Sequence, residues 1–259
     1  RLYSVIIINR ADCFNLKRRI GWLNTGLRCG MGTQMTLINR EDLSGLILAG
    51  GQSRRFNFRN KGLIEFKQKP MIAHVIERIA PHVGSLAISC NTNIAQYQAL
   101  CDTYRAPLGK TSTWGVCLAD SVNNTLKGPL AGIERHLKDI ATPYCFVCSC
   151  DMPLIPSDIV TILTDTMLHS QQQACHIIDD QGLHQLAILV KTNAARAALM
   201  QLTEVNAVTT ASQSGLSRHS IKQWLKQMSS LGIAYTGSAE KMTSINTPEQ
   251  LAIMELTEC

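Results

Sequence analysis

The chain has 259 residues, of which 45% are hydrophobic and 17% charged, which suits one globular domain with a full core and room for an appendage. No apolar run approaches the ~20 residues that a membrane-spanning helix needs, so no membrane partner is expected. The formal net charge is +6, but residues 1–44 carry +4 of it. The nearly neutral remainder gives no electrostatic case for nucleic-acid binding.

The N-terminal segment has no clean hydrophobic periodicity before Met35. The apolar run Val5–Ile8 is too short for a signal-peptide core and has no convincing small-residue cleavage site. We therefore predict that residues 1–34 form an extension outside the fold and that residues 35–259 form a single domain. The alternative is that residues 1–34 form an extra helix packed on the domain.

The cysteines are placed like core residues. A free thiol inside an apolar run acts as a small hydrophobe. A zinc site at the CxxC spacing would need a second pair of ligands on turns, and none is apparent. We predict buried thiols and a reducing, cytoplasmic location. The cysteines in such runs are Cys90, Cys145, Cys148 and Cys150.

From residue 45 onward, buried strands alternate with amphipathic helices. Strands are predicted over 45–49, 86–89 and 144–150, with a strand pair over 175–179 and 185–190. Helices are predicted over 70–79, 94–100, 130–140, 157–168, 192–202 and 217–227, with a final helix after Thr247. Ser157 and Thr247 are predicted N-caps, and residues 203–215 a mobile loop.

This alternation predicts a three-layer, Rossmann-like α/β fold with a mostly parallel sheet. Ligands of such sheets bind beyond the carboxyl ends of the strands. Gly50, Ser89 and Asp151 all fall at predicted strand ends, so we expect them to meet on one rim.

The strongest chemical motif follows the first strand and reads Leu48-Ala49-Gly50-Gly51-Gln52-Ser53-Arg54-Arg55, with Lys61 downstream. Glycines allow the backbone to approach a nucleotide closely, and their N–H groups can face phosphate oxygens. The cations would stabilise a triphosphate and the leaving pyrophosphate. The motif is neither a Walker A loop nor GxGxxG. The alternative is an ordinary strand and turn with surface arginines.

A second candidate is Asp151, which ends the apolar run 144–150. A carboxylate there can hold Mg²⁺ through one oxygen while phosphate oxygens and water complete the coordination. The alternative is a structural aspartate that caps a helix.

Together these motifs resemble the nucleotidyltransferase signature and, within that superfamily, the molybdenum cofactor guanylyltransferases. Besides the glycine loop, three motifs occur in the family's order, and the resemblance covers about residues 44–255. They are Gly128-Pro129-Leu130-Ala131-Gly132, Cys150-Asp151-Met152-Pro153 and Asn246-Thr247-Pro248-Glu249.

The resemblance implies transfer of GMP from GTP to molybdenum-molybdopterin, with Mg²⁺ as cofactor and release of pyrophosphate. It also implies transient contact with other molybdenum-cofactor proteins. It implies catalytic roles for Lys61, Arg55 and Asp151, with Asp151 as the metal ligand, and acceptor contacts for Arg218 and Asn246. The implied nucleotide-binding residues are Leu48, Ala49, Gly50, Gly51, Lys61, Ser89, Asn91, Asp120 and Asp151.

The sequence departs from the family pattern at several positions. Phe56 and Asn57 stand where the family usually has Met-Gly, and Asn60 where it usually has Asp. Ser89 replaces an Asn, and Gly215–Arg218 is the nearest stretch to the family's Gly-Glu-Arg-Arg. The alternatives are a cytidylyl- or sugar-1-phosphate nucleotidyltransferase, or a non-catalytic nucleotide-sensing protein of the same fold.

Overall fold

The computed structural model describes residues 37–50, 54–56, 60–105, 115–118, 126, 128–178, 184–209, 220–237 and 242–256. The predicted extension over residues 1–34 lies outside these ranges and stays a prediction. In the described part of the chain, no helix is both long and apolar enough to span a bilayer.

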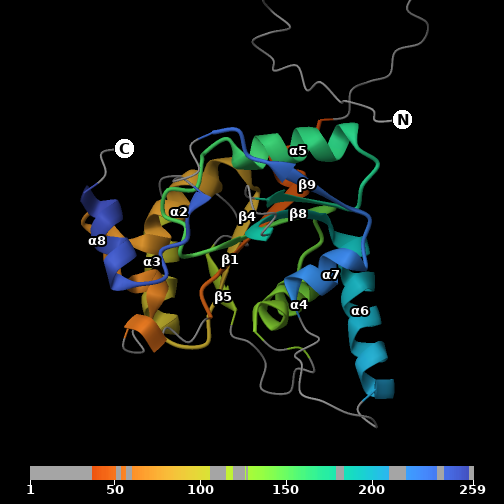
Figure 1. The fold of residues 1–259 in the computed structure, drawn as a ribbon, viewed down its shortest axis with the longest axis horizontal. Helices are drawn as coiled ribbons and strands as arrows, with labels where there is room; N and C mark the ends of the chain where they lie inside the picture. Colours follow the sequence, from red (N-terminus) through yellow and green to blue (C-terminus); the bar gives the residue numbers. More distant parts are fainter. Residues whose placement is uncertain are drawn as a thin grey trace, which may run out of the picture. The chain divides into compact units, whose positions relative to one another are not determined.

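A seven-stranded sheet forms the centre of the fold, with the order β5-β4-β1-β6-β8-β7-β9 (Figure 1). Only β8 runs against its neighbours, and the other adjacent pairs are parallel, so the prediction of a mostly parallel sheet is confirmed. The strands are β1 (Leu43–Leu48), β4 (Ser85–Ser89), β5 (Val116–Leu118), β6 (Tyr144–Ser149), β7 (Ala174–Ile178), β8 (His184–Lys191) and β9 (Ser230–Ala234). A separate hairpin joins β2 (Glu65–Phe66) to β3 (Lys69–Pro70).

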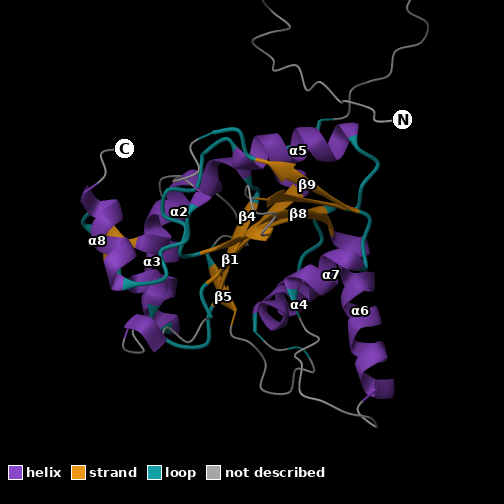
Figure 2. Cartoon of the chain, viewed as in Figure 1, coloured by secondary structure: helices purple, strands orange, loops and turns teal. Residues whose placement is uncertain are grey.

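Helices cover both faces of the sheet, which confirms the three-layer prediction (Figure 2). One face packs against α2 (Met71–Ile79), α3 (Ile94–Arg105) and α5 (Ile159–His169). The other packs against α4 (Pro129–Asp139), α6 (Thr192–Thr209) and α7 (Ile221–Lys226). A last helix, α8, spans Pro248–Leu256.

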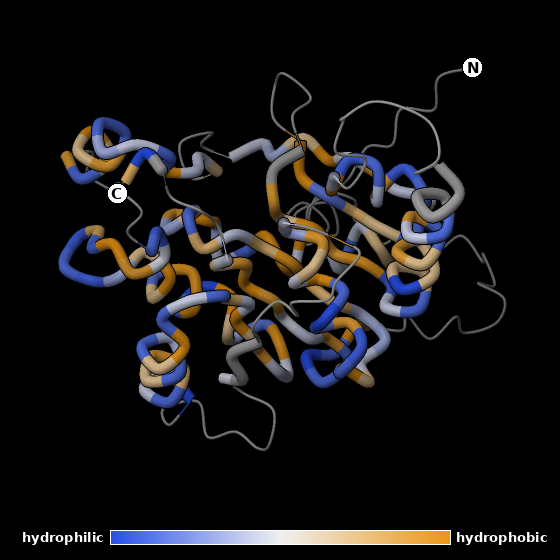
Figure 3. Tube along the Cα trace, turned by 90° about the horizontal axis from the view of Figure 1, so that it is seen from below, coloured by the Kyte–Doolittle hydropathy of each residue, from blue (hydrophilic) through white to orange (hydrophobic). Residues whose placement is uncertain are grey.

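The two faces follow from the alternation of side chains along each strand. In β1, Leu43 and Ile47 join the first apolar cluster, whereas Leu46 and Leu48 join the second. All six β1 residues are buried, as expected for a central parallel strand. Figure 3 shows hydrophobic stretches running through the middle of the fold, while the helices alternate between hydrophobic and hydrophilic turns.

The predicted thiol burial is confirmed at Cys90, Cys145, Cys148 and Cys150, which are free and buried. Burial raises the pKa of Cys145 to about 12, so this thiol stays protonated at neutral pH.

Two element predictions were wrong, and three elements were not predicted. Residues 203–209 continue α6 instead of forming a loop, and the rest of that predicted loop lies outside the described residues. Helix α5 begins at Ile159, with Asp158 rather than Ser157 at the N-cap position. Strands β5 and β9 and the β2–β3 hairpin were not predicted.

The cap at Thr247 is confirmed, because its Oγ1 accepts a hydrogen bond from Gln250 N at 3.2 Å.

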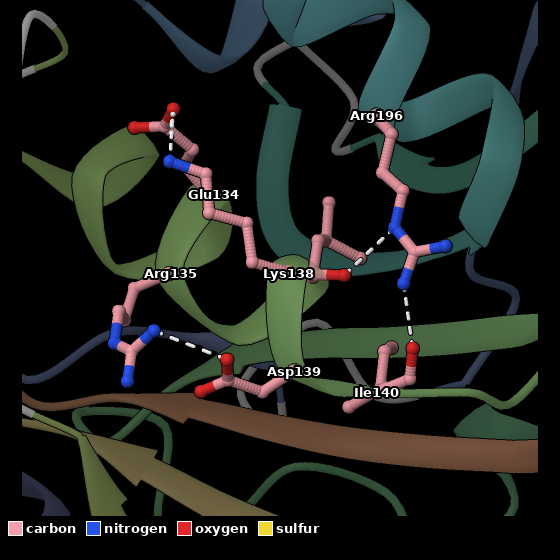
Figure 4. A network of polar contacts seen from close by, with 7 residues as sticks. Glu134, Arg135, Lys138, Asp139, Ile140 and Arg196 are labelled. Atoms are coloured by element: carbon pink, nitrogen blue, oxygen red, sulfur yellow. Dashed lines mark hydrogen bonds and ion pairs between the residues drawn. The ribbon is translucent and has the colours of Figure 1, made fainter.

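Arg196 of α6 satisfies the carboxyl end of α4 (Figure 4). Its Nε donates to Leu137 O at 2.8 Å and its second terminal nitrogen to Ile140 O at 2.5 Å. The last carbonyls of a helix have no intrahelical partner, and a cation there also complements the helix dipole. This contact ties the two helices together on one face of the sheet.

A buried polar pair joins α4 to the central strand. His136 Nε2 and Ser44 Oγ share a hydrogen bond of 2.8 Å, and both residues are at least 96% buried. Burial lowers the pKa of His136 to about 4, with Asp139 opposing the shift. The folded chain therefore keeps this imidazole neutral well below pH 6.5.

This pair predicts an acid-sensitive fold. An unfolded histidine takes up a proton below about pH 6.5, while the folded one stays neutral down to about pH 4. The unfolded state then binds more protons, so the free energy of unfolding falls between these values, by about 3 kcal/mol from this residue. Urea titrations at pH 7, 5.5 and 4.5 measure the effect. His136→Gln should show a shallower pH dependence, and an unchanged slope would contradict the assignment.

Candidate active site at the carboxyl edge of the sheet

The strands β1, β4 and β6 end side by side, which brings three loops to one edge. Leu48 is level with Ser89 on one side and with Ser149 on the other. Beyond the strand ends, Ala49 N donates to Ser89 O at 2.8 Å and Cys150 N to Leu48 O at 3.0 Å. The glycine loop and Asp151 therefore leave the sheet from the same edge, as the sequence predicts.

Lys61 meets Asp151 at this edge. Its Nζ lies 2.5 Å from Asp151 Oδ2, and the two side chains are only 16% and 14% exposed. The same Nζ donates to Asn246 Oδ1 at 2.8 Å. One ammonium group therefore joins three segments that lie far apart in the sequence, each carrying one of the motifs.

The segment that carries Asn246 is held by its backbone. Ile245 N donates to Asp151 O at 2.9 Å, which attaches this segment directly to the residue that ends β6. Asn246 N donates to Gln250 Oε1 at 2.7 Å, which links it to the first turn of α8. The cap of α8 thus helps to aim Asn246 at the lysine.

A small apolar cluster lies beneath these segments. It contains one residue from each: Phe56 after the glycine loop, Leu154 after Asp151, and Ile245 before Asn246. Met254 of α8 and Met71 of α2 also belong to this cluster. Burial of these side chains stabilises the convergence of the loops by the hydrophobic effect. The full cluster of buried residues is Phe56, Phe66, Met71, Leu154, Ile245 and Met254.

The second oxygen of Asp151 is available for a cation. Asp151 Oδ1 is buried and has no hydrogen-bond partner among the described residues. A buried acceptor left unsatisfied costs about 1–3 kcal/mol, and more when it is charged. Mg²⁺ is commonly held by one or two carboxylates, with phosphate oxygens and water as the other ligands. The described residues contain no cluster of three or more His, Cys, Asp or Glu, so the fit is to this single carboxylate.

Cys150, directly before Asp151, is not a nucleophile. Burial and the neighbouring Asp151 raise the pKa of its thiol far above the ordinary value. A protonated, buried thiol contributes packing only.

The other predicted nucleotide-binding residues fall into two groups. Leu48, Ala49 and Ser89 are buried, so at most their backbone groups face the edge. Gly50, Arg55 and Asn91 are exposed to solvent. The predicted residues Gly51, Asp120 and Arg218 lie outside the described residues.

The contact between Lys61 and Asn246 was not predicted. The resemblance implied only that Asn246 faces the acceptor, and no local pattern links residues 185 positions apart. The hydrogen bonds of Asn60 to Thr92 and Tyr97 were not predicted for the same reason.

Residues 45–224 match the family described as the MobA-like NTP transferase domain. A molybdenum cofactor guanylyltransferase of Polynucleobacter asymbioticus is 29% identical over 225 residues, which are 85% of this chain and 98% of the relative. One from Bordetella pertussis is 36% identical over 132 residues. That alignment spans 51% of this chain and 60% of the relative.

Solved structures share the fold. Molybdopterin-guanine dinucleotide biosynthesis protein A of Archaeoglobus fulgidus superposes with a TM-score of 0.60 at 19% identity, covering 82% of this chain and 96% of that one. A 4-diphosphocytidyl-2C-methyl-D-erythritol synthase of Anaerococcus prevotii superposes with a TM-score of 0.57 at 12% identity, covering 86% and 98%. These likenesses confirm the Rossmann-like nucleotidyltransferase fold. With the family match over most of the chain, they lead to one conclusion: the chain belongs to the family of MobA-like NTP transferase domains.

Proposed function

We propose that this protein transfers GMP from GTP to molybdenum-molybdopterin and releases pyrophosphate, in a reaction that depends on Mg²⁺. The observation that carries the proposal is the meeting of Lys61, Asp151 and Asn246 at the carboxyl edge of the sheet. Relatives named molybdenum cofactor guanylyltransferase support the choice of nucleotide and acceptor.

The reaction is a displacement at phosphorus. A terminal phosphate oxygen of molybdopterin forms a bond to the α-phosphorus of GTP, and the bond from that phosphorus to the bridging oxygen of the β-phosphate breaks. The attacking phosphate is already anionic, so the protein need not supply a general base. Its contribution is to position the two substrates and to stabilise the developing charge.

The residues at the edge have distinct proposed roles. Lys61 gives up part of its contact with Asp151 to stabilise the phosphate oxygens and the leaving pyrophosphate. Backbone N–H groups of the glycine loop, at Gly50 and Gly51, face the phosphates. Asn246 and Arg218 contact the acceptor, and Arg55 adds positive charge.

Asp151 would hold Mg²⁺ through its buried, unpartnered Oδ1. When bound, the ion supplies charge neutralisation at the triphosphate. Asp120 is the second candidate ligand, and Leu48, Ala49, Ser89 and Asn91 complete the proposed nucleotide site. The buried free thiols fit a reducing cytoplasm, which we propose as the location.

Asp151→Asn tests the metal role. The change keeps the shape of the side chain and a hydrogen-bond acceptor for Lys61 but removes the charge. We expect a folded protein of similar melting temperature whose GMP transfer falls at least ~100-fold, the scale of losing one transition-state stabiliser. Pyrophosphate release measures turnover, and excess Mg²⁺ should recover little. Asp139→Asn, which alters an exposed ion pair on α4, is the matched control. Normal transfer by folded Asp151→Asn protein would make Asp151 structural.

Lys61→Ala tests the proposed role of the lysine ammonium group. Charge-assisted contacts contribute about 1.5–3 kcal/mol, so turnover should fall by ~10- to 100-fold while the protein stays folded. Lys138→Ala, at an exposed position of α4, should keep wild-type turnover. Wild-type turnover in Lys61→Ala protein would remove this lysine from the site.

Base selection tests the choice of guanine. In competition for binding with Mg²⁺ present, GTP should displace CTP at lower concentration, measured by equilibrium binding of a fluorescent nucleotide. Equal affinity for the two would overturn the guanylyl assignment, and preference for CTP would favour a cytidylyltransferase. Binding without any pyrophosphate release, tried with molybdopterin as acceptor, would favour the nucleotide-sensing alternative.

A further inference from the structure

Asn60, the residue directly before Lys61, is tied to the segment after β4. Its Oδ1 accepts a hydrogen bond from the Tyr97 hydroxyl. Its Nδ2 donates to Thr92 Oγ1 at 3.2 Å and lies 3.4 Å from Asn93 Oδ1. One amide therefore connects the lysine segment to both the β4–α3 loop and helix α3.

The anchor on α3 is rigid. Tyr97 is fully buried within the apolar cluster on that face of the sheet, so its ring fixes where the hydroxyl lies. The loop before it is a defined turn. Asn93 has a left-handed backbone (φ 58), and its carbonyl accepts hydrogen bonds from Gln96 N and Tyr97 N at 3.0 and 3.1 Å. Asn60 is thus held by a group that has little freedom to move.

The residue after the lysine contacts the same hydroxyl. A Cβ added at Gly62 would lie 2.6 Å from Tyr97 Oη and 3.3 Å from Cys150 Cβ and Sγ. The backbone here therefore lies against both α3 and the residue that precedes Asp151. Tyr97 consequently fixes the chain on both sides of Lys61.

This arrangement matters because a lysine side chain is long and flexible. Holding its ammonium group in one place costs rotamer entropy, and a displacement of about 1 Å from the reacting geometry can cost ~100-fold in rate. The backbone contacts at residues 60 and 62 set where the side chain starts. The position of Nζ beside Asp151 depends on them.

We propose that Asn60, held by the Tyr97 hydroxyl, is a positioning residue that fixes Lys61 beside Asp151 for nucleotidyl transfer. This inference rests on the proposed function, because it concerns the same lysine. Asn60 acts through Lys61 and not on the substrate.

A double-mutant cycle tests the inference. Asn60→Ala should lower kcat for pyrophosphate release about 10-fold when Lys61 is present, the upper range for one lost hydrogen bond. In a Lys61→Met background the same change should lower it by less than about 2-fold, because there is no lysine left to position. An equal loss in both backgrounds would show a role independent of Lys61 and overturn the inference.

Two further variants separate positioning from folding. Tyr97→Phe keeps the buried ring and removes only the hydroxyl, so it should reproduce part of the Asn60→Ala loss with little change in melting temperature. Its matched control is Tyr104→Phe on the same helix, whose hydroxyl donates instead to Glu77 at 3.1 Å and whose loss should leave kcat unchanged. Asn60→Asp keeps an acceptor for Tyr97 and should stay within about 3-fold of wild type.

The kcat values of these variants distinguish a failure of the inference from a failure of the proposed function. Normal kcat in Tyr97→Phe would overturn the inference even if Asn60→Ala fails to fold. Wild-type kcat in the Lys61→Met protein would overturn the proposed role of the lysine and this inference with it. A loss in Lys61→Met with no coupling to Asn60 would overturn the inference alone.

Discussion

The ion pair between Lys61 and Asp151 is the contact on which the candidate site depends. Both side chains are largely removed from solvent, and a charge removed from water is costly unless an opposite charge lies close to it. The pair leaves the other carboxylate oxygen buried and without a hydrogen-bond partner in the described part of the chain. In the function proposed above, this oxygen would hold Mg²⁺ and the ammonium group would stay beside the triphosphate.

The pair exists because two features bring distant segments together. The parallel register of β1 with β4 and β6 delivers the glycine loop and Asp151 to one edge. The apolar cluster of Phe56, Leu154 and Ile245 then holds the loops close once they leave the sheet. The first feature is common to doubly wound sheets. The second involves the C-terminal helix, because the cluster also contains Met254 of α8 next to Ile245, the residue before Asn246.

Much of the fold could be predicted from the sequence. The central strands are short apolar runs, and the helices between them have clear hydrophobic periodicity. Strand β5 has only three residues, and β9 lies at the edge with mixed exposure, so neither gives a strong pattern. Residues 203–215 were predicted as a loop because the stretch is rich in Thr, Ser and Gln and has little periodicity, yet 203–209 continue α6. Extending an existing helix adds one hydrogen bond per residue, which outweighs propensity differences of a few tenths of a kcal/mol.

The sequence predicts candidate residues for the site but not the contacts between them. Asp151 and Lys61 stand out through their motifs, whereas the bond from Lys61 to Asn246 joins residues 185 positions apart and depends wholly on tertiary packing. The same holds for Asn60, whose partner Tyr97 is 37 positions away in a predicted helix that carries none of the motifs. Sequence motifs indicate candidate groups, and the fold determines which of them are in contact.

The most direct test of the account is to locate the metal. Crystals grown with GTP and Mn²⁺, a redox-stable and anomalously scattering substitute for Mg²⁺ with similar oxygen ligands, would show the ion in an anomalous difference map. We expect a single strong peak within bonding distance of the Asp151 carboxylate, with triphosphate oxygens on its other side and Lys61 close to the phosphates. A nucleotide bound with its metal away from Asp151, or with its phosphates out of reach of Lys61, would contradict it.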